Sequence, residues 1–181
     1  MQFPYSKEVI KRRSNIVLTG FMGTGKSTVG QIIAEDLGYE FIDTDEAITL
    51  VHGPISKFFE ENGESAFRKL EREISGVLSK RSRLVISTGG GLMLDADCVA
   101  FLEPVSEIFC LSASASEILK RVNENGQAGA RPLLAGDDAA LQIKLLLQSR
   151  SKGYGRYRDV PTDHLSPREV ADVVIAQLAT N

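Results

Sequence analysis

The chain alternates short apolar runs with longer stretches in which apolar residues recur at helical spacing. The first apolar run, 16–18, ends at Gly20, and a helix is expected from about residue 26 to residue 37. Gly38 then supplies a C-terminal stop. The apolar positions that define this helix are Val29, Ile32, Ile33 and Leu37.

The same alternation continues to the end of the sequence. Further strands are expected at 39–42, 84–87, 107–111 and 159–162. Pro161 weakens the pattern of the last strand, because proline cannot donate to a sheet ladder. Helices are expected at 45–51, 55–62, 64–79, 94–102, 114–122, 141–157 and 167–178.

Strands that alternate with helices predict an α/β fold, with a parallel sheet covered on both faces. In such sheets ligands bind beyond the carboxyl ends of the strands. Gly20 follows the first expected strand, Asp43 and Asp45 follow the second, and 89–91 follow the third. We therefore expect a binding site at this edge, within one domain that spans residues 1–181.

Composition narrows the class of protein. The 181 residues are 43% hydrophobic and 25% charged, as in a compact globular domain. The net charge of −3 gives no basic field for nucleic acid, and the basic cluster 11–13 is read as a solvated arm. No apolar run reaches the ~18 residues of a membrane span. Two cysteines without motif spacing, and no secretory pattern in residues 1–14, predict a cytoplasmic protein.

The most specific motif is a phosphate-binding loop at residues 20–27, which reads G-x-x-x-x-G-K-S. Its glycines let backbone N–H groups converge on phosphate oxygens in front of a helix N-terminus. Lys26 would place a cation on the β- and γ-phosphates, and Ser27 would offer a hydroxyl ligand to Mg²⁺. A chance match in a glycine-rich turn is the alternative, but the strand before the loop and the helix after it favour nucleotide binding.

The second expected strand ends in two acidic residues. Mg²⁺ sites use one or two carboxylates together with phosphates and water, which suits Asp43. Asp45 could accept a hydrogen bond from an acceptor hydroxyl and act as a base. The alternative is that Asp45 caps the helix that follows.

Two further features suggest an anion site. Arg68 and Glu71 lie three residues apart on an expected helix, either as a surface ion pair or as a carboxylate-binding arginine oriented by the glutamate. Three successive glycines, Gly89, Gly90 and Gly91, are typical of close contact between backbone and ligand, although a tight turn is the alternative.

The glycine-containing stretch 123–138 is expected to be a mobile lid. It would bring Arg131 to the transferring phosphoryl group, although an ordinary surface loop is the alternative. Three more arginines follow, and the sequence does not say which of them points inward: Arg150, Arg156 and Arg158.

Taken together, these motifs resemble the shikimate kinase family over residues 15–178. The matching segments are GFMGTGKST at 20–28, FIDTD at 41–45, ISKFFEENGESAFRKLE at 55–71, STGGG at 87–91, RPLL at 131–134 and RSKGY at 150–154. The resemblance implies a three-layer α/β/α fold with a five-stranded parallel sheet, the P-loop NTPase fold. It also implies transfer of the ATP γ-phosphate to the 3-hydroxyl of shikimate, with one Mg²⁺ per subunit.

The resemblance also implies roles for individual residues. Catalysis would fall to Lys26, Asp45 and Arg131, and the metal to Ser27 and Asp43. Helices between about 45 and 80 would form the acceptor side. Shikimate would be held by Asp45, Arg68, Gly89, Gly90, Gly91 and Arg150. ATP would be held by Gly23, Thr24, Gly25, Lys26, Ser27, Thr28, Arg121, Arg131 and Pro167, with the loop 162–167 around adenine.

Two rival functions stay open at this point. One is a kinase for another small acceptor, such as gluconate or a nucleotide. The other is a nucleotide-binding protein without catalysis, which the presence of all the expected catalytic residues argues against. We expect a monomer whose partners are the small molecules ATP and shikimate, with no nucleic acid and no membrane.

Overall fold

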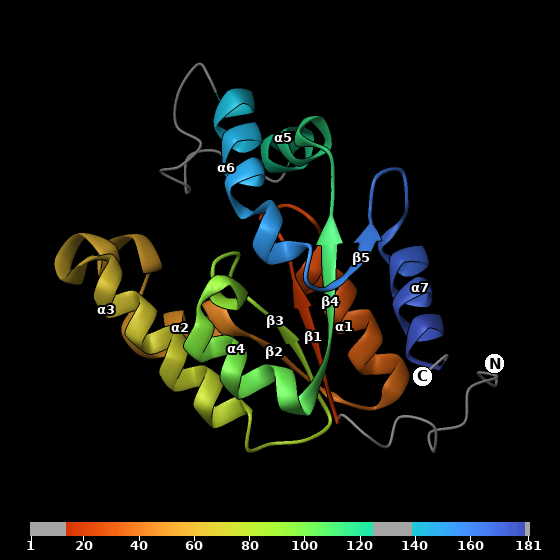
Figure 1. The fold of residues 1–181 in the computed structure, drawn as a ribbon, viewed down its shortest axis with the longest axis horizontal. Helices are drawn as coiled ribbons and strands as arrows, with labels where there is room; N and C mark the ends of the chain where they lie inside the picture. Colours follow the sequence, from red (N-terminus) through yellow and green to blue (C-terminus); the bar gives the residue numbers. More distant parts are fainter. Residues whose placement is uncertain (1–13, 125–138, 180–181) are drawn as a thin grey trace.

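The computed structural model describes residues 14–124 and 139–179, and it contains a five-stranded parallel sheet (Figure 1). The strand order is β2-β3-β1-β4-β5. All four neighbouring pairs are parallel, which confirms the expected sheet. The strands are β1 (Asn15–Thr19), β2 (Glu40–Asp43), β3 (Leu84–Ser87), β4 (Ser106–Ser112) and β5 (Arg158–Pro161).

Helices cover both faces of the sheet, because successive side chains of the central strand point to opposite sides. Ile16 and Leu18 of β1 pack in one core with α1 (Lys26–Leu37) and α7 (Pro167–Ala179). Val17 packs in a second core with α3 (Ile55–Leu78) and α4 (Ala96–Leu102). The result is the expected three-layer α/β/α arrangement.

The other helices lie near the carboxyl ends of the strands. The short helix α2 (Thr44–His52) follows β2 and contacts α3. In Figure 1, α5 (Ala115–Glu124) and α6 (Ala139–Tyr154) lie side by side beyond the end of β4. Phe21 of the phosphate loop packs into the core under these two helices. Two 3₁₀ turns complete the described elements: Leu92–Leu94 and Glu103–Val105.

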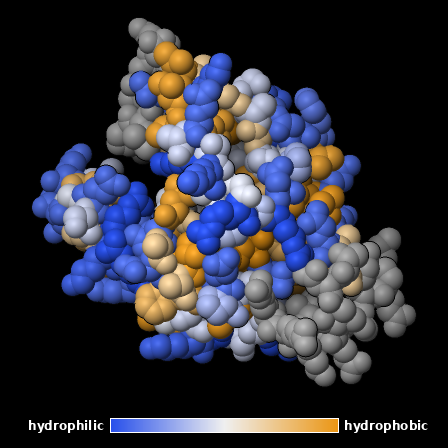
Figure 2. Space-filling model, in the orientation of Figure 1, coloured by the Kyte–Doolittle hydropathy of each residue, from blue (hydrophilic) through white to orange (hydrophobic). Residues whose placement is uncertain are grey.

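Helix α3 contains a break at the position where the sequence predicts one. The predicted helices 55–62 and 64–79 follow each other directly in α3, but Gly63 between them has φ 79° and ψ 170°. These angles are accessible to glycine and strained for other residues. The first part of α3 therefore departs from the direction of the second, and Figure 2 shows it within a mainly hydrophilic lobe.

Single residues set the start of helix α4 and the end of strand β5. The helix expected from residue 94 begins at Ala96, because the carboxylate of Asp95 accepts from the backbone N–H groups of Asp97 (3.0 Å) and Cys98 (3.2 Å). Pro161 is the last residue of β5, which lies at the edge of the sheet. An edge position tolerates the missing N–H, so the strand forms despite the proline.

Burial explains the state of both thiols. Cys98 and Cys110 are buried, as the apolar run around Cys110 predicts, and burial raises the pKa of each thiol to about 11. Both thiols therefore stay protonated and unreactive near neutral pH. Among the described residues, no helix combines the length and the apolar character that a membrane span requires.

Candidate active site

A pocket of about 1180 Å³ lies at the carboxyl ends of β1, β2 and β3. It contains every expected site residue of the described chain. Arg131, and the expected lid at 123–138 beyond Glu124, lie outside the described residues. The predicted residues that line the pocket are Gly23, Thr24, Gly25, Lys26, Ser27, Thr28, Asp43, Asp45, Arg68, Gly89, Gly90, Gly91, Arg121, Arg150 and Pro167.

The phosphate loop connects β1 to the start of α1. Gly20 has φ 129°, and a Cβ there would lie 2.2 Å from the carbonyl oxygen of Leu111, so this position requires glycine. Gly25, also at positive φ, precedes α1, and no side chain in the described structure caps this helix. The first N–H groups of α1 are therefore available to an anion.

Lys26 is held close to the loop that it follows. Its Nζ atom donates to the carbonyl oxygen of Phe21 at 2.9 Å, and the residue is 9% exposed. The hydroxyl of Thr24 donates to the same carbonyl at 2.8 Å. The loop is thus closed on itself, with the ammonium group beside the N-terminus of α1, where phosphate oxygens are favoured.

Oxygen atoms from three elements meet beside Lys26. The Oγ atom of Ser27 donates to Asp43 Oδ2 at 2.6 Å and lies 3.3 Å from the Oγ atom of Ser87. Carboxylate and hydroxyl oxygens suit Mg²⁺, which also keeps waters and phosphate oxygens as ligands. In the described part of the chain, no three His, Cys, Asp or Glu side chains form a metal cluster. The oxygens of Ser27, Asp43 and Ser87 suit a Mg²⁺ ion whose other ligands would be water and phosphate oxygens.

Asp43, rather than Asp45, caps helix α2. Its Oδ1 atom accepts from the backbone N–H groups of Asp45 (3.0 Å) and Glu46 (3.3 Å). The capping alternative considered for Asp45 is therefore wrong, because the helix begins one residue earlier, at Thr44. Asp45, in the first turn, lines the pocket instead.

The three glycines after β3 lie directly against the side chains of the pocket. A Cβ on Gly89 would lie 2.5 Å from Asp45 Oδ1, and a Cβ on Gly91 would lie 2.7 Å from Arg68 Nη1. These contacts, rather than unusual dihedral angles, explain two of the glycines. The tight-turn alternative accounts for neither contact.

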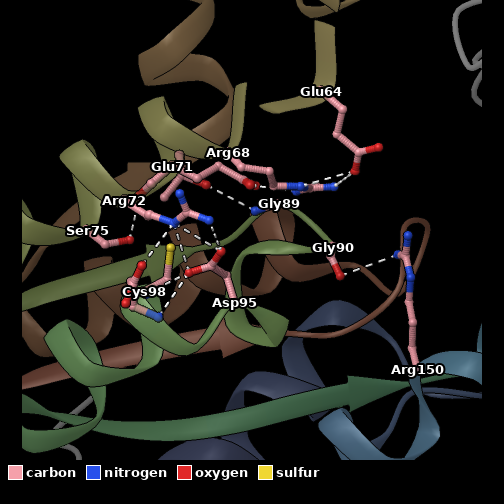
Figure 3. Close-up of polar contacts among 12 residues, drawn as sticks. Glu64, Arg68, Glu71, Arg72, Ser75, Gly89, Gly90, Asp95, Cys98 and Arg150 are labelled. Atoms are coloured by element: carbon pink, nitrogen blue, oxygen red, sulfur yellow. Dashed lines mark hydrogen bonds and ion pairs between the residues drawn. The ribbon is translucent and has the colours of Figure 1, made fainter. Parts of the chain in front are cut away.

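Arg68 is held by two carboxylates, as Figure 3 shows. Its Nη1 atom lies 2.5 Å from Glu71 Oε2, and its Nη2 atom lies 2.9 Å from Glu64 Oε1. Glu71 is 1% exposed, so the surface ion-pair interpretation is wrong and the orienting interpretation fits.

Burial dominates the electrostatics of this pair. It raises the pKa of Glu71, and the hydrogen bond from Arg68 opposes the rise only in part. Burial would lower the pKa of Arg68, but the hydrogen bonds and charges of Glu71 and Glu64 raise it overall. Arg68 therefore stays cationic, and it carries the compensating charge for a desolvated carboxylate.

Of the three arginines near the C-terminus, Arg150 is the one that lines the pocket. Its guanidinium lies 5.4 Å from the ring centroid of Phe21, and its Nη1 atom is 3.4 Å from the carbonyl oxygen of Gly90. Tyr154, one turn later on α6, donates to the same carbonyl at 2.6 Å. Arg156 and Arg158 pair instead with Glu103 and Glu107.

Arg121 also lines the pocket, and hydrogen bonds hold its guanidinium in place. Its Nη1 atom is 3.3 Å from the carbonyl oxygen of Gly23 and 3.0 Å from Thr162 Oγ1, and Nη2 donates to the carbonyl oxygen of Thr162 at 2.8 Å. Glu117 accepts from Nε at 2.9 Å. These contacts join the phosphate loop to Thr162, and Pro167 also lines the pocket.

Several residues that line the pocket were not expected there, among them Glu64, Ser87 and Glu117. Tyr154, which donates to the carbonyl of Gly90, was not expected either. Tyr154 and Glu117 each lie four residues from a predicted arginine on the same helix, and this spacing could have indicated them. Ser87 ends the third strand, directly before Thr88 and the glycines, and its position at the sheet edge was the available signal.

We expect Gly89→Ala to lower kcat about tenfold or more, because the new methyl group displaces the carboxylate of Asp45. Steady-state kinetics measures this effect. Gly76→Ala in α3 is the matched control, since its Cβ would lie at an ordinary 3.5 Å from Phe101. That variant should keep its kcat and gain about 0.5–1 kcal/mol of stability from helix propensity. A kcat for Gly89→Ala equal to that of the control would show that the new methyl group does not disturb Asp45.

Comparisons with known proteins agree on one family. The family model described as shikimate kinase matches residues 22–179. A shikimate kinase of Thermodesulfovibrio yellowstonii is 41% identical over 165 residues, covering 90% of this chain and 94% of the relative. One from Caldicellulosiruptor bescii is 42% identical over 164 residues, with the same coverage of both chains.

Solved structures give the same picture. The shikimate kinase of Acinetobacter baumannii, in complex with shikimate, is 31% identical, with a TM-score of 0.87 over 97% of this chain and 98% of that one. A gluconokinase from Sinorhizobium meliloti is 21% identical, with a TM-score of 0.65 over 93% of each chain. At that identity the second likeness shows the fold alone.

Proposed function

The chain belongs to the shikimate kinase family, and we propose that it transfers the γ-phosphoryl group of ATP to the 3-hydroxyl group of shikimate. The products would be ADP and shikimate 3-phosphate, in the biosynthesis of aromatic amino acids through chorismate. One observation carries the proposal: a single pocket contains both the phosphate loop and an acid–arginine site. Donor and acceptor can thus meet within one cavity.

In this proposal the nucleotide lies along the phosphate loop. The N–H groups of residues 23–28 and the N-terminus of α1 hold the phosphates, and Lys26 neutralises the charge that develops on the transferred group. Arg121 and the segment 162–167 border the nucleobase. Arg131 is proposed from the sequence to act on the same phosphoryl group.

The acceptor is held from the opposite side. Arg68 and Arg150 would bind its carboxylate, since guanidinium groups can bond both carboxylate oxygens. Asp45, against Gly89, would accept the hydrogen bond of the reacting hydroxyl and take its proton. The main-chain carbonyl of Gly90 accepts from both Tyr154 and Arg150, which would help to hold Arg150 in position.

Magnesium completes the proposed site. Ser27 and Asp43 would hold the ion, with Ser87 as a neighbour of the hydroxyl ligand. When bound, the ion supplies positive charge to the phosphate oxygens. Asp43 also fixes the start of α2 through Oδ1, so the same carboxylate joins the metal position to that of Asp45.

A coupled assay of ADP release tests the proposal over a panel of acceptors: shikimate, gluconate, a nucleoside monophosphate and a neutral polyol. We expect ADP release with shikimate and, at equal concentration, less than about one hundredth of that rate with the others. Preferential use of gluconate or of the nucleotide would overturn the substrate assignment. Binding of ATP without turnover of any acceptor would favour the non-catalytic rival.

A single domain, a monomeric state and a cytoplasmic location belong to the same proposal.

A further inference from the structure

Arg68 is bonded to two carboxylates, and one of them lies along the Nε–Nη2 edge with which a guanidinium can bind an acid. Glu64 Oε1 accepts from Nη2 at 2.9 Å and from Nε at 3.3 Å, along one edge (Figure 3). Glu71 Oε2 accepts from Nη1 at 2.5 Å. The Nε–Nη2 edge of Arg68 is therefore in use within the protein, and its Nη1 atom is engaged by Glu71.

The two glutamates differ in how firmly they are held. Glu71 is 1% exposed, and it would lose its compensating charge if it left Arg68. The side chain of Glu64 is 68% exposed, so water can solvate its carboxylate when it leaves the arginine. Glu64 also lies in the first turn after the break at Gly63, where a negative charge is favoured. Glu64 is thus the carboxylate that can be exchanged.

A substrate carboxylate that approached Arg68 would be the third carboxylate beside a single guanidinium. One guanidinium already faces two carboxylates, and all three side chains line the pocket. Like charges at such separations repel, so an incoming acid gains most when one of the resident carboxylates leaves. The exposed Glu64 occupies the Nε–Nη2 edge that an incoming carboxylate would need.

We propose that Glu64 is a specificity-determining residue that occupies the Nε–Nη2 edge of Arg68 in the free protein and is displaced by the carboxylate of the substrate. This inference rests on the proposed function and deepens it. An acceptor with a carboxylate replaces the ion pair that it breaks. A neutral acceptor offers no replacement and finds Arg68 already neutralised, so the exchange favours acidic acceptors.

Calorimetric titration and steady-state kinetics with Glu64→Gln test the exchange. Loss of the competing charge should tighten shikimate binding roughly two- to fivefold, the range of an exposed ion pair, and lower KM by the same factor while kcat changes less. Binding of the neutral methyl ester of shikimate should not tighten. Glu73→Gln is the matched control, since Glu73 pairs with Lys69 at 3.8 Å on the same helix, away from the pocket. Its shikimate affinity should equal that of the parent.

Weaker or unchanged shikimate binding in Glu64→Gln would overturn the inference, because Glu64 would then support the site rather than compete for it. An equal gain for the methyl ester would overturn it too, by showing a change of pocket shape. Glu64→Ala, with thermal unfolding as a check of the fold, should repeat the gain. The parent protein tests the proposed function separately: failure to phosphorylate shikimate would contradict that function whatever the variants show.

Discussion

We expect Lys26→Ala to lower kcat at least about 100-fold, a cost of about 3 kcal/mol or more in the activation barrier. Phosphoryl transfer spreads negative charge over the phosphate oxygens, and an ammonium group placed before the reaction starts stabilises that charge without reorganisation. Lys26 is nearly buried, and the carbonyl of Phe21 holds it beside the N-terminus of α1. Single-turnover kinetics with saturating ATP measures the loss in the transfer step.

Lys69→Ala is the control for this prediction. Lys69 lies on the exposed side of α3, 3.8 Å from Glu73, with a side chain that is 75% exposed. Its removal changes the net charge equally and should leave kcat within about twofold, since exposed ion pairs contribute little. Near-normal turnover by Lys26→Ala would rule out the proposed charge stabilisation.

We expect Arg68→Ala to weaken shikimate binding by about 100-fold, because it would remove two charge-assisted hydrogen bonds to the substrate carboxylate. The effect should fall on KM more than on kcat, since the carboxylate lies away from the reacting hydroxyl. Arg72→Ala is the matched control, because Arg72 lies one turn later on α3 and pairs with Asp95 at 2.8 Å, outside the pocket. Equal KM values for the two variants would remove Arg68 from the substrate site.

Arg68→Ala also changes the pH dependence of stability, through Glu71. Burial already raises the pKa of Glu71 above its unfolded value, and loss of Arg68 raises it further. A raised pKa contributes stability below the unfolded value, near 4.3, and that stability is lost as pH rises through the folded value. Urea unfolding should therefore show a destabilisation of about 3 kcal/mol at pH 7 that shrinks toward pH 4.5. A pH-independent loss would contradict the buried carboxylate.

The phosphate loop and the strand ends could be predicted because their signals are local. The spacing of Gly20, Gly25 and Lys26 in the sequence is enough to predict the conformation of the loop. The break at Gly63 follows in the same way from the backbone preference of a single residue. Such features depend on neighbours in the sequence, so the fold reproduces them.

The partners of the arginines could not be predicted, because they depend on packing between elements. Three arginines lie within residues 150–158, but only the rotation of α6 and the pairing of β5 decide that Arg150 faces Gly90. The burial of Glu71, whose side chain is 1% exposed, depends in the same way on how α3 packs against other elements, α4 among them. Asp43 took the capping role considered for Asp45 because α2 starts one residue early.

The most direct measurement follows the phosphorus atoms of ATP by ³¹P NMR, in a mixture of the protein with magnesium and shikimate. The account predicts that the γ-phosphate signal is lost in equal proportion to the gain of a phosphate monoester signal, coupled to the proton on carbon 3 of shikimate. Release of the γ-phosphate only as inorganic phosphate, or an unchanged spectrum, would contradict it.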